Sequence, residues 1–309
     1  MTNMANMTNM TNMTNMTNLS PPLRRKAIYE QCHHLSHIYN LMVDSVDEAV
    51  ESIESYNPFR GTMNDPQFVE FRFKKYLPDT ARFKRSDADI HEAVDVWCDS
   101  KNVNHKEREH TYGHISDWDT SKVTNMKKLF SGKLRFNCDI GAWDVSQVTI
   151  MMGMFVNAEA FNQDIGTWDV SKVTDMSAMF YGVTAFNQDI GAWDVSRVTN
   201  MEWMFNCANA FNRDIGAWDT SRVTDMSAMF GCATIFNQDI GQWNVSRVIN
   251  MSAMFASTGA AFEQDIGRWD VSRVADMSYM FRNTIAFNRG TEQWNISGAT
   301  NVMHMYNSI

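Results

Sequence analysis

The segment FNQDIGAWDVSRVTNMEWMF, residues 186–205, decides the fold, because closely similar segments precede and follow it along the chain. Each copy carries one tryptophan at the same place, and neighbouring tryptophans are 25 residues apart except for one step of 26. They are Trp118, Trp143, Trp168, Trp193, Trp218, Trp243, Trp269 and Trp294. A repeat of this period is typical of proteins built from stacked units. Eight units therefore fill residues 113–309.

The unit that begins at Ile165 shows what one repeat predicts. Its first part, IxxWxVxxV, is close to the LxxLxLxxN spacing of leucine-rich repeats and predicts a short strand over 165–173. Met176, Met179 and Phe180 then have helical spacing after Thr174, a good N-cap residue, so a short helix is expected over 174–180. Neither element is stable alone. We therefore predict an α/β repeat fold, a leucine-rich-repeat-like parallel solenoid in which every coil buries its neighbours. The recurring Phe-Asn pair is expected to form an inward amide ladder from Asn162, Asn187, Asn212, Asn237 and Asn288.

The chain before the repeats has two further parts. Residues 1–20 hold a Met-Thr-Asn triplet repeat, which predicts a disordered leader. Residues 21–112 have no repeat, and their apolar spacing predicts a mainly helical N-terminal domain that caps the first coil. One of its helices is expected within 86–101, capped by Ser86, with Ile90, Val94 and Trp97 facing inward.

Composition excludes several classes of protein. The 309 residues carry a formal net charge of −9, so we expect no nucleic-acid partner, because phosphate binding needs clustered Lys and Arg. Five cysteines without CxxC spacing fit neither a disulfide framework nor a zinc module. No transmembrane segment and no secretory signal are recognisable. A cytoplasmic or otherwise intracellular location is therefore expected.

The repeat resembles that of the BspA-like leucine-rich-repeat surface proteins, and more narrowly the 25-residue FNQDIxxWDVSxVTxMxxMF repeats first described as a domain of unknown function in Mycoplasma lipoproteins. The similarity covers residues from about 115 to 309. It implies a solenoid that serves adhesion or protein binding, often at the cell surface, without an established enzymatic activity. The cell surface is therefore the alternative location.

Catalytic, cofactor and metal sites are not expected. The chain has no GxSxG, HExxH or phosphate-cradling motif, so we predict that it is not an enzyme. Two recurring Asp positions suggest calcium, but the calcium-binding solenoid motif GGxGxD is absent and Lys or Arg recurs three residues after one of them. We expect these charges to form a solvated, salt-linked face. Cys207 and Cys232 occupy equivalent positions in adjacent repeats and are expected to be free thiols.

Function is expected in residues that do not recur, because stacking explains those that do. Ten residues after each repeat tryptophan the chain is mostly small or polar, but Trp203 and Tyr279 are aromatic there, with Ala228 and Ala253 between them. We predict that these four residues line a notch that binds an unknown protein partner. The alternative is that the two rings pack on neighbouring structure. The predicted function is a non-enzymatic protein–protein interaction scaffold, and the alternative is a surface adhesin or virion coat component that recognises host proteins or glycans.

Overall fold

The computed structural model of the chain describes residues 84–99, 112–258, 262–284 and 290–306. The chain divides into two compact units, one of residues 1–84 with 104–113 and the other of residues 85–103 with 114–309. Almost all described residues belong to the second unit. The segment 85–103 therefore groups with the repeats, whereas the sequence placed it in a domain ending at residue 112. The expected leader and the helices expected before residue 84 lie outside the described residues.

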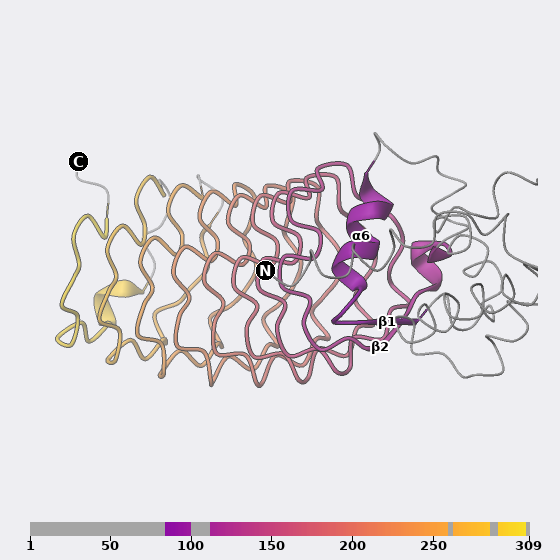
Figure 1. Cartoon of the computed structure of the whole chain (residues 1–309). Helices are drawn as coiled ribbons and strands as arrows, with labels where there is room; N and C mark the ends of the chain where they lie inside the picture. The colour runs from indigo at the N-terminus through magenta and orange to yellow at the C-terminus, as the bar shows by residue number, and fades with distance from the viewer. Residues whose placement is uncertain (1–83, 100–111, 259–261, 285–289, 307–309) are drawn as a thin grey trace, which may run out of the picture. The chain divides into compact units, whose positions relative to one another are not determined.

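The regular elements of the described residues lie mainly next to the first repeat (Figure 1). Strand β1 (Lys84–Ser86) pairs with strand β2 (Asp119–Lys122), and helix α6 spans Ile90–Cys98. Two 3-10 helices, η3 (Ile115–Asp117) and η4 (Thr291–Gln293), begin the first and last described coils.

Helix α6 confirms the helix expected within residues 86–101. Ile90, Val94 and Trp97 are buried, as their spacing predicts. The N-cap prediction is wrong, because the helix begins one turn later, with Asp89 as the N-cap residue. Ser86 instead ends β1, and its backbone N–H and hydroxyl donate to Oδ1 of Asp89.

The repeats form successive coils that lie side by side, drawn from magenta to yellow in Figure 1. Each coil makes one parallel β-bridge with the next, at the residue seven positions after its tryptophan. The bridges join Asn125, Ile150, Asp175, Asn200, Asp225, Asn250, Asp276 and Asn301 in that order. The expected strand over 165–173 is not formed. That segment consists of turns, with backbone bonds from Trp168 to Ile165 and from Val173 to Val170.

Backbone N–H groups after the bridge alternate between two kinds of partner, and together they form what we call the ladder. In the third described coil, the N–H groups of Met176, Ala178, Phe180 and Gly182 donate to carbonyl oxygens of the next coil over 2.7–3.1 Å. The intervening N–H groups of Met179, Tyr181 and Val183 donate to the carbonyl three residues earlier in their own coil, each over 3.1 Å. All these backbone donors are therefore paired without a helix or a long strand.

The ladder explains why the helix expected over 174–180 is not formed. Ala178 has φ 51° and Gly182 has φ 68°, both in the left-handed region. A right-handed helix requires negative φ at every residue. The methionines and phenylalanine nevertheless point into the core, where Met176, Met179 and Phe180 are fully buried. Helical spacing therefore identified the buried residues correctly, although alternating turns produce it here.

Aromatic rings form continuous stacks through the core. Equivalent phenylalanines of adjacent coils, such as Phe155 and Phe180, are nearly parallel with ring centroids 5.7 Å apart. Each later tryptophan also donates its indole N–H to an isoleucine carbonyl of the preceding coil, as Trp193 does to Ile165 over 3.1 Å. Every buried indole of this set therefore both packs and hydrogen-bonds, which is how tryptophan is stabilised in a core.

The first coil has no preceding coil, and α6 covers its exposed end. Trp97 of α6 meets Trp118 edge-on with ring centroids 6.3 Å apart, and the Arg85 guanidinium lies 4.4 Å above the Trp118 ring. The buried indole N–H of Trp118 has no hydrogen-bond partner among the described residues. Within the described part of the chain, no isoleucine carbonyl takes the role here that it has for the later tryptophans.

Asp87 takes the place of a second backbone acceptor that the first coil lacks at this end of the stack. In later coils the N–H six positions after the tryptophan donates to the preceding coil, as Thr149 does to the carbonyl of Thr124 over 2.9 Å. At the first coil the N–H of Thr124 donates instead to Oδ1 of Asp87 over 2.7 Å, and the Thr124 hydroxyl bonds to Oδ2. Burial of Asp87 raises its pKa, but these bonds and that from Asn125 outweigh burial, so the pKa is lowered.

A ladder of asparagine side chains joins the coils on another side. Oδ1 of each asparagine accepts the backbone N–H of the equivalent residue in the next coil over 2.9–3.1 Å. The acceptors are Asn137, Asn162, Asn187, Asn212 and Asn237. An amide ladder is what the recurring Phe-Asn pair predicted. Asn288, expected to belong to it, lies outside the described residues.

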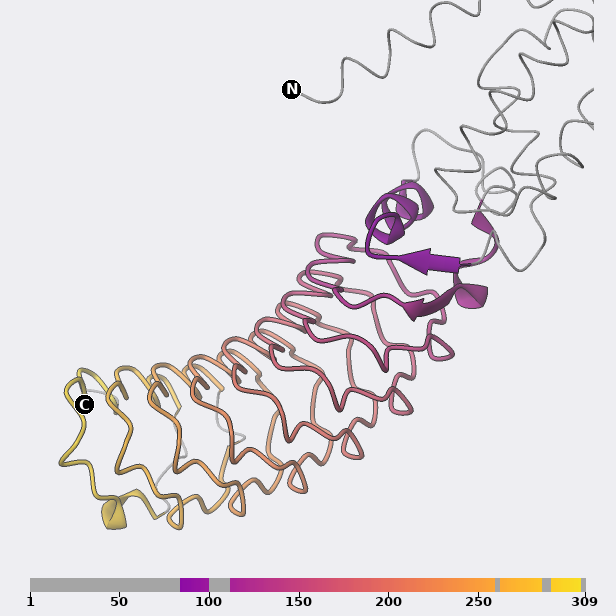
Figure 2. The same cartoon turned by 60° about the horizontal axis from the view of Figure 1, so that its bottom comes forward.

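The stack of coils bends, as Figure 2 shows. Backbone groups that hydrogen-bond across the ladder lie about 4.8 Å apart from coil to coil. The ring centroids of Trp218 and Trp243, in contrast, are 6.4 Å apart. Because the coils are closer at the ladder than at the tryptophans, the ladder lies on the concave side. The ladder side chains that do not point into the core therefore face the inside of the curve.

We predict that Trp193 stabilises the stack through both its ring and its N–H. Trp193→Phe keeps an aromatic ring but leaves the buried Ile165 carbonyl without its donor, and should lower the free energy of unfolding by about 1–3 kcal/mol. Trp193→Ala should cost about 3–5 kcal/mol because it also opens a cavity. Urea denaturation followed by circular dichroism measures both changes. Equal stability of the wild type and the Phe variant would contradict the hydrogen bond.

The substitution Ala178→Gly should change the free energy of unfolding in opposite directions in the ladder and in a helix. Glycine accepts positive φ without steric cost, so this change should raise the free energy of unfolding by about 1 kcal/mol. In a helix it would lower it by about the same amount. Ala185→Gly, at a position outside the left-handed set, is the control and should be destabilising. Urea midpoints of the two variants give the comparison.

Asp87→Ala should lower the free energy of unfolding by about 1–2 kcal/mol, as loss of a helix-capping side chain does. Since folding lowers the Asp87 pKa from 3.8, its charge-dependent contribution is present above that pH and is lost as the pH falls through the folded-state pKa. The difference in the free energy of unfolding between wild type and variant should therefore become smaller as the pH is lowered from about 7 to about 3. Urea midpoints at both pH values measure it, with Glu92→Ala on α6 as the control. A gap independent of pH would show that the Asp87 carboxylate makes no charged contribution.

Candidate functional site

The four residues predicted as a binding notch lie in one column of the ladder, which we call the Trp203 column. It consists of Lys128, Gly153, Ala178, Trp203, Ala228, Ala253, Tyr279 and His304. All eight have positive φ, with 59° at Trp203 and 58° at Tyr279. This conformation is easy for glycine and uncommon for other residues, and least expected for bulky ones. The column therefore holds its aromatic residues in a strained backbone conformation.

Trp203 is the most accessible tryptophan of the coils. Its side chain is 40% exposed, whereas Trp193 of the same coil is 4% exposed. The Trp203 ring contacts Tyr181 of the preceding coil with centroids 5.6 Å apart and planes tilted by 45°. One side of the indole is thus supported, and a large part of the ring faces solvent.

Tyr279 lies at the other end of the predicted notch. Its ring stacks on His304 of the next coil with centroids 5.4 Å apart, and the Arg282 guanidinium lies 5.4 Å from the ring centre. Trp203 and Tyr279 therefore contact partners on opposite sides, away from each other. Ala228 between them is buried and Ala253 is half-buried. The structure brings the four residues into one column, with the two rings at the ends of an open surface.

The recurring aspartates are engaged in local turns. Oδ1 of the residue after each tryptophan accepts the backbone N–H two positions later, as Asp219 does from Ser221 over 3.0 Å. Hydrogen bonds from the serine hydroxyl and backbone lower the pKa of Asp169, Asp219 and Asp270. Among the described residues, no three His, Cys, Asp or Glu side chains converge as a metal site requires. These carboxylates therefore shape turns.

The other recurring Asp position, such as Asp164, also forms a turn, because its Oδ1 accepts the Gly166 N–H over 3.0 Å. A third set of acidic residues lies at the bridge and alternates with asparagine. Asn250 donates its amide to Oδ2 of Asp225 over 3.2 Å, and Asn301 donates to Asp276 over 3.1 Å. Like charges in neighbouring strands destabilise a sheet. Alternation of Asp and Asn replaces that repulsion by a hydrogen bond.

Basic residues four positions after the tryptophans of five successive coils form a column, which the sequence analysis treated only as counter-charge. This cation column contains Lys172, Arg197, Arg222, Arg247 and Arg273 in successive coils. Coulombic attraction to Lys172 contributes to the lowered pKa of Asp169. The ion pairs found between two described residues, Lys133 with Asp95 and Arg85 with Asp89, lie beside α6 and do not involve the cation column. The expected salt-linked face is therefore not formed by the cation column in the described structure.

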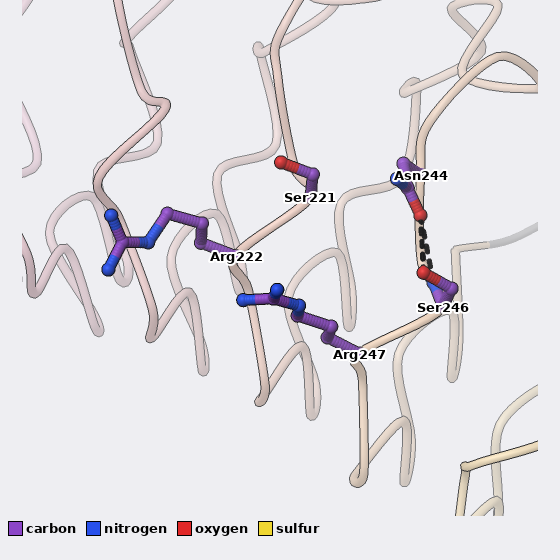
Figure 3. Close-up of a pocket in the computed structure, with 5 residues that line it drawn as sticks. All are labelled: Ser221, Arg222, Asn244, Ser246 and Arg247. Carbon is purple, nitrogen blue, oxygen red and sulfur yellow. Dashed lines mark hydrogen bonds between the residues drawn. The ribbon is translucent and has the colours of Figure 1, made fainter.

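A hollow open to solvent lies within the cation column (Figure 3). Ser221, Arg222, Asn244, Ser246 and Arg247 line it. Figure 3 shows the two arginine side chains running the same way from adjacent coils. Oδ1 of Asn244 accepts both the N–H and the hydroxyl of Ser246, over 3.1 and 2.7 Å. The signal that sequence reasoning passed over is Asn244 itself, which replaces the aspartate of the preceding coils.

Cys207 and Cys232 are free thiols in adjacent coils. Burial, together with the neighbouring Cys232, raises the pKa of Cys207 to about 11. The thiolate is the reactive form of cysteine, so this environment suppresses the reactivity of Cys207 at neutral pH.

No helix among the described residues is long and apolar enough to cross a membrane. This agrees with the expectation from the sequence within that part of the chain.

Comparison with known proteins assigns the family. No curated protein and no solved structure matches the chain. A family model described as "Mycoplasma protein of unknown function, DUF285" matches residues 99–218 and 203–309, which together cover more than half of the chain. The match confirms the Mycoplasma-type repeat, while the wider BspA-like assignment stays a prediction. The chain therefore belongs to the DUF285 family of Mycoplasma proteins of unknown function.

Proposed function

We propose that this protein is a non-enzymatic scaffold, a leucine-rich-repeat-like solenoid that binds a protein partner through the Trp203 column. The observation that carries the proposal is the exposed indole of Trp203 on a left-handed backbone position, with φ 59° and 40% of the residue accessible. The ladder requires left-handed backbone throughout this column, so the exposed ring is what distinguishes Trp203 from the alanines of the column.

The energetics of Trp203 support a role in binding. A non-glycine residue in the left-handed region costs about 1–2 kcal/mol, and Gly153 occupies the equivalent position without that cost. The contact with Tyr181 returns about 0.5–1.5 kcal/mol, as aromatic pairs do. Trp203 therefore adds little net stability to the folded chain. An exposed tryptophan that does not stabilise its own fold is well suited to anchor a partner.

The position of the column also supports binding. It belongs to the ladder, on the concave side of the stack, and concave surfaces of repeat proteins commonly bind partners. Ala228 and Ala253 present small side chains beside the indole, so a partner can approach the backbone closely there. Tyr279 supplies a second aromatic surface farther along the same column.

The absence of catalysis is part of the proposal. The recurring aspartates, asparagines and indole N–H groups are used in turns and between coils, as with Asp219, Asn187 and Trp193. Groups that are engaged in this way do not form a separate reacting centre.

We propose an intracellular location.

A surface adhesin that recognises host proteins or glycans is the second candidate, and membership of a family described from Mycoplasma favours it. Protease treatment of intact cells distinguishes the two. Digestion of the protein while a cytoplasmic marker survives would favour the adhesin, and full protection would favour the intracellular scaffold.

Trp203→Gly should separate binding from stability. Glycine relieves the strained φ while the ring contact with Tyr181 is lost, so the free energy of unfolding should change by less than about 1 kcal/mol. The affinity for the partner should fall by at least about 30-fold, as loss of an interface hot spot implies. The partner is first identified by cross-linking to the wild type and mass spectrometry, and its affinity is then measured by calorimetry.

Ala178→Gly is the matched control, because it makes the same backbone change in the same column without removing a ring. It should leave the affinity unchanged. Undiminished binding by Trp203→Gly would overturn the proposal. So would a loss of stability as large as that of Trp193→Ala, because the indole would then be part of the core.

A further inference from the structure

We infer that the cation column is a second binding surface, and that the hollow at Arg222 and Arg247 anchors an acidic, extended segment of a protein partner. This inference rests on the proposed function, because it assumes a protein partner. It concerns a different surface, four residues after each tryptophan instead of ten, and therefore has its own test.

The hollow offers hydrogen-bond donors that are not used within the protein. Neither guanidinium group, of Arg222 or Arg247, has a hydrogen bond or ion pair in the described part of the chain. Oδ1 of Asn244 is occupied by Ser246, which leaves the Asn244 amide N–H groups as its available polar atoms. Arginine pairs bidentately with carboxylates, and its five donors have no acceptor function. The chemistry of the lining therefore selects an anion.

Asn244 is the residue that makes this coil different. In the coils on either side the equivalent residue is an aspartate, Asp219 or Asp270, next to an arginine three positions later. At Arg247 that carboxylate is replaced by a neutral amide. Asp219 keeps its place beside Arg222, so the two coils at the hollow hold two arginines and one carboxylate of this column, whereas each flanking coil has one arginine and one aspartate. Positive charge is therefore least compensated at the hollow.

The spacing of the column matches an extended peptide. Arg197, Arg222, Arg247 and Arg273 recur once per coil, and the tryptophans of the two coils at the hollow are 6.4 Å apart. In an extended chain, side chains on one face recur every two residues, about 6.6–6.8 Å apart. Acidic residues at alternate positions would thus meet successive arginines.

A nucleic acid fits the surface less well. The protein carries a net charge of −9, which repels a polyanion of high charge density, whereas a short acidic peptide brings only a few carboxylates. The aspartates beside the arginines add local repulsion that is smallest at the hollow. A segment with one acidic residue at the hollow and others at alternate positions would therefore pair with the arginines with the least repulsion from the aspartates.

The test uses the full chain and a fluorescent peptide of about ten residues in which Glu alternates with Ser, so that its charges have the spacing of an extended strand. Fluorescence anisotropy should show binding at about 20 mM salt that weakens strongly by about 300 mM, because exposed charges are screened. A peptide of the same composition with its Glu residues in one block should bind more weakly.

Two sets of variants locate the site. The double change Arg222→Gln with Arg247→Gln should lower the peptide affinity by at least about tenfold, and Lys127→Gln with Arg135→Gln, which removes the same charge from exposed residues outside both columns, should not. Asn244→Asp restores the residue of the neighbouring coils and should weaken binding several-fold with unchanged urea stability. Asn295→Asp, the same change in the last coil, is its matched control and should leave the affinity unchanged.

Several results would overturn the inference. They are no peptide binding at the lower salt concentration, equal binding by the wild type and the double arginine variant, an equal effect of Asn244→Asp and Asn295→Asp, and tighter binding of single-stranded DNA than of the peptide. Peptide binding that survives Trp203→Gly supports this surface independently of the Trp203 column. If the partner of the wild type binds the arginine variant normally, the proposed function stands and this inference fails.

Discussion

The structure depends on one constraint, the alternation of backbone hydrogen bonds along each coil. One N–H group donates to the adjacent coil, and the following one donates within its own coil. This alternation pairs the N–H groups after each bridge without a helix or a long strand. It also requires left-handed backbone at two positions per coil, such as Ala178 and Gly182. The burial of the Met and Phe side chains, the curvature and the Trp203 column follow from this arrangement. The side chains in between are turned inward, so Met176, Met179 and Phe180 become core.

Each coil is stable only because of its neighbours. Indole N–H groups, asparagine amides and ladder carbonyls all find partners one coil away, as in Trp193 to Ile165 and Asn187 to Asn162. The ends of such an array therefore need substitutes. At the first coil Asp87 takes the place of a missing carbonyl, and α6 covers the first tryptophan. The orphaned N–H of Trp118 marks the one place among the described tryptophans where no substitute is found.

Function is sought where the repeat changes. Trp203 places a large exposed ring in a column that also holds glycine and alanines, and Asn244 departs from the aspartates of its own column by removing a charge. The first change exposes an aromatic anchor on the concave side, and the second removes the carboxylate that would lie beside Arg247. Both are single-residue differences in a coil whose other residues are required for stacking. A repeat scaffold can thus carry binding surfaces without altering its core.

The sequence by itself determined the repeat, its register, the buried residues, helix α6 and the amide ladder, because periodic burial and periodic pairing leave a direct mark on residue type. It also singled out Trp203 as an exception. It did not determine the path of the backbone: a helix and alternating turns bury the same Met and Phe residues, and only the hydrogen bonds between coils distinguish them. Nor did it show that Arg222 and Arg247 stay clear of the aspartates, since the aspartates are committed to turns that form only in the folded coil. The backbone path was decided by tertiary structure, because it depends on hydrogen-bond partners about 25 residues away.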